Sequence, residues 1–292
     1  MSISEINALI TLIDDPDESV FSQVQSEIKS YGETIIPYLG HYRDTHHYGE
    51  LFKNRIEDLI NDIHVSVTEA ELTEWMKTEE RDLLEGLLIV NRYQYPTLDA
   101  REIKKEVWRI RKDIWLELND NLTALEIINV FNHILYKEYG FAGNRQNYTA
   151  PQNSFLSDLL HTKKGNPLAL SMVYQILANS LDVPLYGVNL PNHFILAYVD
   201  DSALLLSDEE SNGTGVLFYV NPFSEGAVIH KNEIDDFISH LNLPQKAAYY
   251  SPCSNIDMLC RMMNNLIFSF TQLNEGRKAE DIKRLLTVLS AQ

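Results

Sequence analysis

A glycine turn that leads into an apolar helix is the first feature of this sequence that suggests chemistry. Residues 164–184, KGNPLALSMVYQILANSLDVP, predict a turn at Gly165, a helix that ends near Leu181 and a strand after it. In many enzymes such a helix start holds a nucleophile, because the helix dipole stabilises its anionic form. The sequence places Pro167 there, and proline has no ionisable side-chain atom. Covalent chemistry at this position is therefore excluded.

Ser171 and His193 form an alternative pair of candidate catalytic residues. Ser171 lies one turn beyond Pro167 on the same predicted helix face, and His193 begins the strand-like run HFILAY. A histidine can accept the proton of a serine hydroxyl, so the pair could cleave an amide or an ester. Serine inside a helix more often donates to a backbone carbonyl, and we expect this of Ser171. We expect His193 to be buried and hydrogen-bonded to Asn221 or to a backbone carbonyl.

Asn153 and Ser154, in the run PQNS, are candidate ligand-binding residues. A proline followed by asparagine and serine is also typical of a helix cap, because the short polar side chains accept hydrogen bonds from the first free N–H groups. The following run, FLSDLL, has the composition of a short helix. We favour the capping role for both residues.

One cluster resembles a metal site. It consists of His41, His46, His47 and Glu50. The cluster contains no cysteine and no pair of histidines four residues apart, the spacing that places two ligands on one helix face. We therefore interpret these residues as solvated loop side chains, and the sequence predicts no metal and no cofactor.

The two cysteines are Cys253 and Cys260, seven residues apart in a segment with a helical pattern. On one helix they would lie two turns apart on the same face, which is too far for a disulfide. A chain without a disulfide framework is typical of a reducing compartment. We expect both thiols to be buried or nearly so.

The charge balance limits the partners of this chain of 292 residues. It has 24 Lys and Arg against 42 Asp and Glu, a net charge of -18, which repels both nucleic acid and anionic lipid. The N-terminal run MSISEINALITLIDD is acidic rather than basic, unlike a secretory signal. No apolar run approaches the roughly 20 residues that span a bilayer. These features predict a cytoplasmic protein that binds neither nucleic acid nor membrane.

Helices are predicted at both ends of the chain and through much of its middle. Residues 3–85 have helical spacing throughout, and SYGETIIPYLGHYRD resembles the junction of a HEAT-type helix pair. From Asp99, a helix presents an apolar stripe that Trp108 and Trp115 are expected to broaden. Residues 254–273 and 277–290 predict a terminal helix pair that resembles a tetratricopeptide unit.

Strands are predicted between these helical parts. The runs PLYGVNLPNHFILAYVDDSALLL and GVLFYVNPF are short, aromatic and β-branched, which favours antiparallel strands. The polar loop between them includes Asp208, Glu209 and Glu210, which we expect at a solvated hairpin tip. The sequence therefore predicts an α+β fold that is mostly helical.

Four motifs in order carry a resemblance to a known family. They are EYGFAGNRQNY, PQNSFLSDLLHTKKGNPLAL, LDVPLYGVNLPNHFILAY and VNPFSEG. The series resembles the SirB-type bacterial family, whose members have a transglutaminase-like (papain-like) core between helical flanks. The resemblance covers roughly residues 100–290. It implies a transglutaminase-like core with a small antiparallel sheet at 86–250 and a tetratricopeptide-like (TPR-like) pair at 251–292. The helical pattern of residues 1–85, which are less diagnostic of the family, predicts a HEAT-like region before this core.

The resemblance also implies where a catalytic triad would lie. Catalytic members of the wider superfamily use Cys, His and Asp, in which the histidine takes the proton of the thiol and the carboxylate orients the imidazole. Matching the motifs places Pro167 at the cysteine, His193 at the histidine and Asn221 at the aspartate. Asparagine can hydrogen-bond an imidazole but cannot stabilise an imidazolium as a carboxylate does. SirB-type proteins in general lack the cysteine, so the departure at Pro167 agrees with the closer family.

These features predict a non-catalytic, transglutaminase-like protein that acts as a protein-binding or regulatory scaffold. Its degenerate triad site would remain as a folding centre or as a ligand pocket near Asn153, Ser154 and His193. A protein partner would bind through the helical flanks. The alternative is a residual amide or ester hydrolase that uses His193 with Ser171 or with an activated water.

Overall fold

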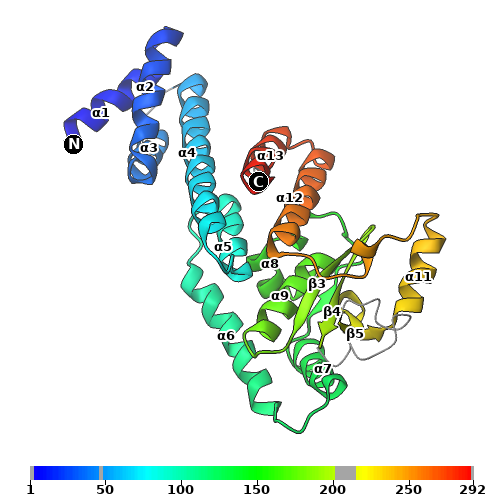
Figure 1. The fold of residues 1–292 in the computed structure, drawn as a ribbon. Coiled ribbons are helices and arrows are strands. Elements are labelled where there is room, and N and C mark those ends of the chain that lie inside the picture. The colour runs from blue at the N-terminus through cyan, green and yellow to red at the C-terminus, as the bar shows by residue number, and fades with distance from the viewer. Residues whose placement is uncertain (1–2, 46–48, 201–214, 291–292) are drawn as a thin grey trace. The chain divides into compact units, whose positions relative to one another are not determined.

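The computed structural model describes residues 3–45, 49–200 and 215–290, which Figure 1 shows in colour. The chain divides into two compact units, residues 1–74 and residues 75–292. The fold is α+β and mostly helical, as the sequence predicts. The finer division into residues 1–85, 86–250 and 251–292 stays a prediction.

Helices build the first unit. They are α1 (Ile3–Thr11), α2 (Glu18–Ser30), α3 (Ile36–Thr45) and α4 (Glu50–Lys77), with short 3-10 turns at Leu12–Asp14 and Gly32–Ile35. Arg55 on α4 is buried, and its guanidinium donates to the carbonyl oxygens of Ile13 and Asp15 and pairs with Glu18. These bonds hold the turn between α1 and α2, because a buried guanidinium must find acceptors for its N–H groups.

The second unit is a small sheet with helices around it. Its helices are α5 (Leu83–Gln94), α6 (Ala100–Glu117), α7 (Ala124–Asn132), α8 (Leu156–Thr162), α9 (Pro167–Asn179), α11 (Lys231–His240), α12 (Asn255–Gln272) and α13 (Gly276–Ser290). A π-helical turn at His133–Glu138 continues α7. Together with α1–α4, helix α5 confirms the prediction that residues 3–85 are helical where the structure describes them.

Four antiparallel strands form the sheet in the order β3 (Leu185–Leu190), β4 (His193–Val199), β5 (Val216–Asn221) and β6 (Ala227–Ile229). Helix α9 packs against β3 and β4 on one face, as Figure 1 shows, and α11 covers the other face through Ile234 and Ile238. A second, parallel pair joins β1 (Ala142–Gly143) to β2 (Lys164–Gly165), just before α9. The antiparallel strands predicted within residues 184–199 and 215–223 are confirmed, whereas the predicted run at 201–205 lies outside the described residues.

The terminal helix pair is confirmed where it was predicted. Helix α12 ends at Gln272, and α13 begins at Gly276 after a turn in which Asn274 has a φ of +59°. Asparagine tolerates this left-handed conformation better than most residues do. Apolar side chains of both helices, among them Phe270 and Ile282, are buried. The likeness of this pair to a tetratricopeptide unit, and of the N-terminal helices to HEAT repeats, stays a prediction.

The expectation for the two tryptophans of α6 is wrong. Trp108 is 46% exposed and Trp115 is 58% exposed, whereas Val107, Ile110 and Ile114 are buried. A helix turns by about 100° per residue, so positions 108 and 115 point well away from their neighbours 107 and 114. The buried stripe of α6 is therefore narrower than the sequence suggests.

The expected helical position of Cys253 is also wrong. Helix α12 begins only after Ser254, whose hydroxyl accepts the Asp257 N–H while the Asp257 carboxylate accepts the Ser254 N–H. This reciprocal cap ends the helix at its N-terminal side. Cys253 lies in the preceding loop, where its N–H donates to the carbonyl of Gly187 in β3. Both cysteines are free thiols.

Several predicted features fall outside the described residues: His46 and His47 of the metal-like cluster, and the hairpin tip at Asp208, Glu209 and Glu210. Over residues 3–45, 49–200 and 215–290, no group of three or more His, Cys, Asp or Glu side chains is arranged to hold a metal ion. In the same ranges, every helix is too short or too polar to cross a bilayer.

A hydrogen-bonded junction holds the end of β5 against α7. The Asn132 carboxamide donates to the Gly226 carbonyl at 2.9 Å and accepts from the Tyr174 hydroxyl of α9 at 3.1 Å. Tyr136 donates to the carbonyl of Pro222 at 3.0 Å. These bonds fix the turn that follows Asn221, so they position one side of the candidate site.

Gly226→Ala should lower the free energy of unfolding more than Gly140→Ala. Both glycines have φ near +70°, where a side chain costs about 1–2 kcal/mol. An added Cβ at Gly226 would lie 1.7 Å from Asn132 Oδ1, whereas one at Gly140 meets nothing within 4 Å. We expect Gly226→Ala to cost at least about 1 kcal/mol more, because the Asn132 hydrogen bonds are lost. Urea denaturation measures the free energy of unfolding of both variants. Equal decreases in this free energy would show that the hydrogen-bonded junction at Asn132 does not contribute to stability.

Candidate functional site

Asn166 caps the helix that carries the predicted nucleophile position. Its Oδ1 accepts the Ala169 N–H at 2.9 Å, its Nδ2 donates to Ser154 Oγ at 2.9 Å, and Pro167 is the first residue of α9. Proline suits this position because the first N–H groups of a helix have no partner within it. A Cβ at the preceding Gly165 would lie 2.8 Å from Leu159 Cδ1, so a side chain there would require Leu159 to shift.

Asn153 supports the loop beside this helix start. It is buried, and its Nδ2 donates to the carbonyls of Asn147 and Tyr148 while its Oδ1 accepts from Asn144. The predicted capping role is wrong: the N-cap residue of α8 is Phe155, and no side chain caps that helix. The side chains of Asn153 and Ser154 instead turn toward the loop and toward Asn166, where they satisfy buried polar groups.

His193 begins β4 after a two-residue turn, Pro191 and Asn192, in which Asn192 has a φ of +56°. Proline followed by a residue with positive φ is typical of a type II turn. The imidazole lies between the rings of Phe223 and Phe237, with centroids 6.4 Å and 6.2 Å away. These aromatic neighbours remove water from the imidazole.

Three effects act on the pKa of His193. Burial lowers it most, the neighbouring Asn221 carboxamide raises it, and the positive charge of Arg261 lowers it. Asn221 Oδ1 is itself buried and has no hydrogen-bond partner in the described structure. A buried acceptor without a donor favours a neighbour that can supply an N–H, which a protonated imidazole does. The net result is a pKa below the ordinary value of a histidine.

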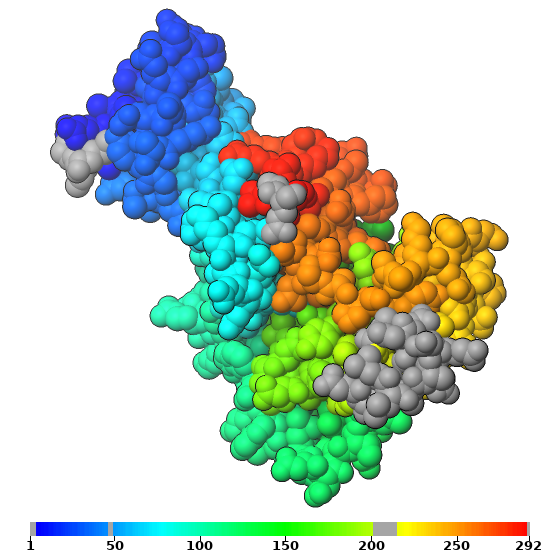
Figure 2. All heavy atoms as spheres, in the orientation of Figure 1, coloured from blue at the N-terminus to red at the C-terminus, as the bar shows by residue number. Residues whose placement is uncertain are grey.

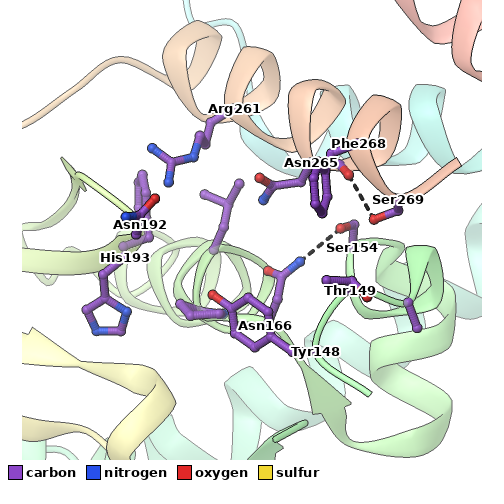
Figure 3. A pocket seen from close by; sticks show the side chains of 14 residues that line it. Tyr148, Thr149, Ser154, Asn166, Asn192, His193, Arg261, Asn265, Phe268 and Ser269 are labelled. Carbon is purple, nitrogen blue, oxygen red and sulfur yellow. Dashed lines mark hydrogen bonds between the residues drawn. The ribbon is translucent and has the colours of Figure 1, made fainter. Parts of the chain in front are cut away.

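A pocket of about 90 Å³, which we call the Arg261 pocket, lies beside this histidine. Pro167 and Asn166 line it from the start of α9, His193 and Asn192 from the β3–β4 turn, and Arg261 from α12. Figure 3 shows Arg261, Asn192 and His193 along one side, opposite Ser154 and Ser269. The structure therefore brings Pro167, Ser154 and His193 to one pocket, while Asn153 lies behind its wall.

A second pocket, which we call the Asn221 pocket, has a volume of about 440 Å³. His193, Asn192 and Asn221 line it together with Glu233 and Phe237 of α11. His193 thus borders both pockets, and Asn221 approaches it from the neighbouring strand β5. Of the other two positions that the family resemblance assigns to a triad, Pro167 borders the first pocket with His193 and Asn221 borders the second.

Arg261 is the residue of the site that sequence reasoning missed. Its Nη1 donates to Asn189 Oδ1 at 2.6 Å and lies 3.4 Å from the Leu190 carbonyl, so α12 is tied to the end of β3. Burial lowers the pKa of its guanidinium. The only signal in the sequence was a charged residue inside the apolar pattern of a helix, which is too common to mark a site.

The alternative nucleophiles lie away from the pockets. Ser171 is fully buried, and its hydroxyl donates to the carbonyl of Pro167 at 2.8 Å, which confirms the predicted backbone bond. Burial raises the pKa of Cys253 to about 12 and also raises that of Cys260. Neither thiol lines the Arg261 pocket or the Asn221 pocket. The raised pKa values favour the protonated thiol at neutral pH, and the thiol is a weaker nucleophile than the thiolate.

NMR titration of His193 should give a pKa below about 6.5, the value of an unperturbed histidine. Asn221→Ala should lower this pKa further, because the carboxamide favours the protonated form, and Arg261→Gln should raise it by removing a positive charge. Arg111→Gln, at an arginine that instead bonds to Ser180, serves as the control and should change nothing. A His193 pKa that rises in Asn221→Ala or falls in Arg261→Gln would contradict the effects assigned to these two side chains.

Comparison with known proteins agrees with this fold. A family model described as the transglutaminase-like superfamily matches residues 101–264, more than half of the chain. A UPF0162 protein of Xylella fastidiosa (strain 9a5c) is 27% identical over 73% of this chain and 74% of its own length. A UPF0162 protein of Vibrio cholerae is 27% identical over 54% of this chain and 53% of its own length.

A further relative comes from animals. Human F-box only protein 21 is 28% identical over 49% of this chain but only 21% of its own length. The chain thus spans from about a fifth to three quarters of the curated relatives it matches. No solved structure matches the chain. The match over residues 101–264, which include α9, β4, β5 and much of α12, shows that the chain belongs to the transglutaminase-like superfamily.

Proposed function

We propose that this protein is a non-catalytic member of the superfamily, of the SirB type, that acts as a protein-binding or regulatory scaffold. The degenerate site at His193 binds a ligand and does not transform it. The observation that carries this proposal is Pro167: it is the first residue of α9, it borders the same pocket as His193, and it has no atom that can attack a carbonyl. A base in such a site has no nucleophile to activate.

The other hydroxyls support the proposal. Ser171 is buried and bonded to the Pro167 carbonyl. Ser269, in the wall of the Arg261 pocket, donates to the carbonyl of Asn265, and Ser154 accepts from Asn166. A serine nucleophile needs a hydroxyl that is free to give its proton to the base. Ser171 and Ser269 donate their protons to backbone carbonyls instead, and Ser154 is buried.

The alternative is a hydrolase in which His193 activates a water. One observation favours it: the lowered pKa keeps His193 neutral at neutral pH, which is the form that accepts a proton. Against it, the group that approaches the imidazole is the carboxamide of Asn221, which carries no charge to stabilise the imidazolium that would form. The hydrolase mechanism that uses Ser171 as the nucleophile is disfavoured because the Ser171 side chain is buried.

A turnover screen separates the two functions. We expect no turnover above background when wild-type protein and His193→Ala are tested against peptides, amides and esters. We expect His193→Ala only to lower the free energy of unfolding, by about 1–3 kcal/mol, because Phe223 and Phe237 lose a packing partner. His161→Ala, at an exposed position of α8, is the control. Wild-type turnover that disappears in a folded His193→Ala protein would make the protein an enzyme.

The scaffold role includes a protein partner that binds through the helical flanks. Large apolar side chains are exposed there: Leu51 in the N-terminal flank, and Phe268 and Leu273 at 54% and 53% exposure in the C-terminal pair. Figure 2 shows α12 and α13, orange to red, on the surface of the 75–292 unit. Large apolar side chains exposed to solvent are candidates for contacts with other proteins. The net charge of -18 supports a protein in the cytoplasm and argues against nucleic acid or membrane as partner.

Affinity capture with matched variants tests the partner. A protein retained specifically by the wild type should be lost with Leu273→Glu, which places a charge on the apolar surface, and kept with Gln272→Glu. Gln272 is exposed at the adjacent position, so its substitution adds the same charge without removing an apolar contact. Equal retention by all three forms would place the contact elsewhere. If no form retains a partner, the scaffold role loses its support.

A further inference from the structure

Arg261 is a positive charge without a counter-charge. No carboxylate lies within ion-pair distance of it in the described structure, and none of the residues that line the Arg261 pocket is an aspartate or glutamate. Arg261 is half-buried, so part of the water that would stabilise its charge is removed and an anion in the pocket would be favoured.

The guanidinium has donors to spare for such an anion. Its Nη1 is engaged with Asn189 and with the carbonyl of Leu190. An arginine has five N–H donors in a planar fork, so those on Nη2 and Nε remain. Figure 3 shows Asn192 next to the guanidinium and Asn265 on the same helix as Arg261. Since Nη1 anchors the side chain, the remaining donors are held in place before a ligand arrives.

Two carboxamides of the same pocket also have free hydrogen-bonding groups. The side chains of Asn192 and Asn265 make no hydrogen bond to any residue that the structure describes, although both line the Arg261 pocket. A carboxamide offers a donor and an acceptor, and so can bind the oxygens of an acid or an adjacent amide group. By contrast, Asn166 is engaged with Ala169 and Ser154. Arg261, Asn192 and Asn265 therefore offer free hydrogen-bonding groups within the same pocket.

We propose that the Arg261 pocket binds an organic carboxylate, held by the guanidinium of Arg261 and by the carboxamides of Asn192 and Asn265. This inference rests on the proposed function, because it names the ligand class of the same site. One guanidinium neutralises one charge and matches a planar carboxylate, whereas a phosphate dianion would keep a second charge without a cation. A pocket of about 90 Å³ suits a small group rather than a large ligand.

The carboxylate could come from a small free acid or from the C-terminus of a peptide. Propionate serves as the first probe, N-acetyl-Gly-Gly-Ala with a free carboxylate as the second, and the C-terminal amide of the same peptide as the control. Binding is followed by NMR titration of the full-length protein. Binding of propionate alone assigns the small acid, and tighter binding of the peptide assigns the chain end.

We expect the acid form to bind at least tenfold more tightly than the amide. Arg261→Gln should remove this difference, Arg261→Lys should restore part of it through the charge, and Arg111→Gln should leave it unchanged. Bound carboxylate should also raise the pKa of His193 in the wild type, which a merely structural arginine would not produce. If Arg261→Gln does not fold, the affinities of the acid and the amide for the wild-type protein test the inference by themselves.

Three results would overturn the inference. They are equal affinity for the acid and the amide, carboxylate binding that is undiminished in a folded Arg261→Gln protein, and a loss of carboxylate affinity in Arg111→Gln equal to that in Arg261→Gln. Its failure differs from that of the proposed function. Hydrolysis of a bound substrate that depends on His193 would refute the non-catalytic role and leave the carboxylate site standing. Absence of both turnover and carboxylate binding would refute the site alone.

Discussion

The carboxamide of Asn166 is the interaction on which the site depends. It caps α9 through Ala169 and bonds to Ser154, while the backbone N–H of Asn166 donates to the carbonyl of Asn153. One buried residue thus fixes the helix start, the loop before α8 and the position of Pro167. Removing this carboxamide would leave several buried polar groups unpaired at once, and each of them costs about 1–3 kcal/mol.

A second set of hydrogen bonds joins α12, which forms the opposite wall of the Arg261 pocket, to the sheet. Arg261 of α12 bonds to Asn189 and Leu190 at the end of β3, directly before the turn that leads to His193. Its charge also lowers the pKa of that histidine. The C-terminal helix pair, which the sequence suggests as a separate flank from residue 251, therefore supplies a wall of the pocket and a charge that acts on His193.

The fold was largely predictable from local patterns. Helical periodicity located α12 and α13, and the change to short aromatic runs located β3, β4 and β5, because each pattern reflects which face of an element is buried. Local patterns failed where a single residue decides the geometry. Ser254 caps α12, so the helix begins at Asn255 and leaves Cys253 in the loop before it. Trp108 is exposed because it lies about 100° around α6 from the buried Val107.

The site was predictable only in part. Pro167, His193 and Asn221 could be placed by motifs, since each stands at the start or end of an element. Arg261 could not, because its role depends on α12 lying across the β3–β4 turn, and no spacing in the sequence encodes that contact. The roles of Asn153 and Ser154 depend on the same kind of tertiary contact, with the loop and with Asn166.

The central claim is that Pro167 occupies the position from which a nucleophile would face His193. Pro167→Cys tests it most directly, by measuring the rate at which iodoacetamide modifies the new thiol as a function of pH, with and without His193→Ala. The account predicts that Cys at 167 reacts faster than Cys253 and Cys260, whose pKa values are raised, and that His193→Ala slows it. A new thiol that reacts as slowly as the native two, or that is indifferent to His193, would contradict the account.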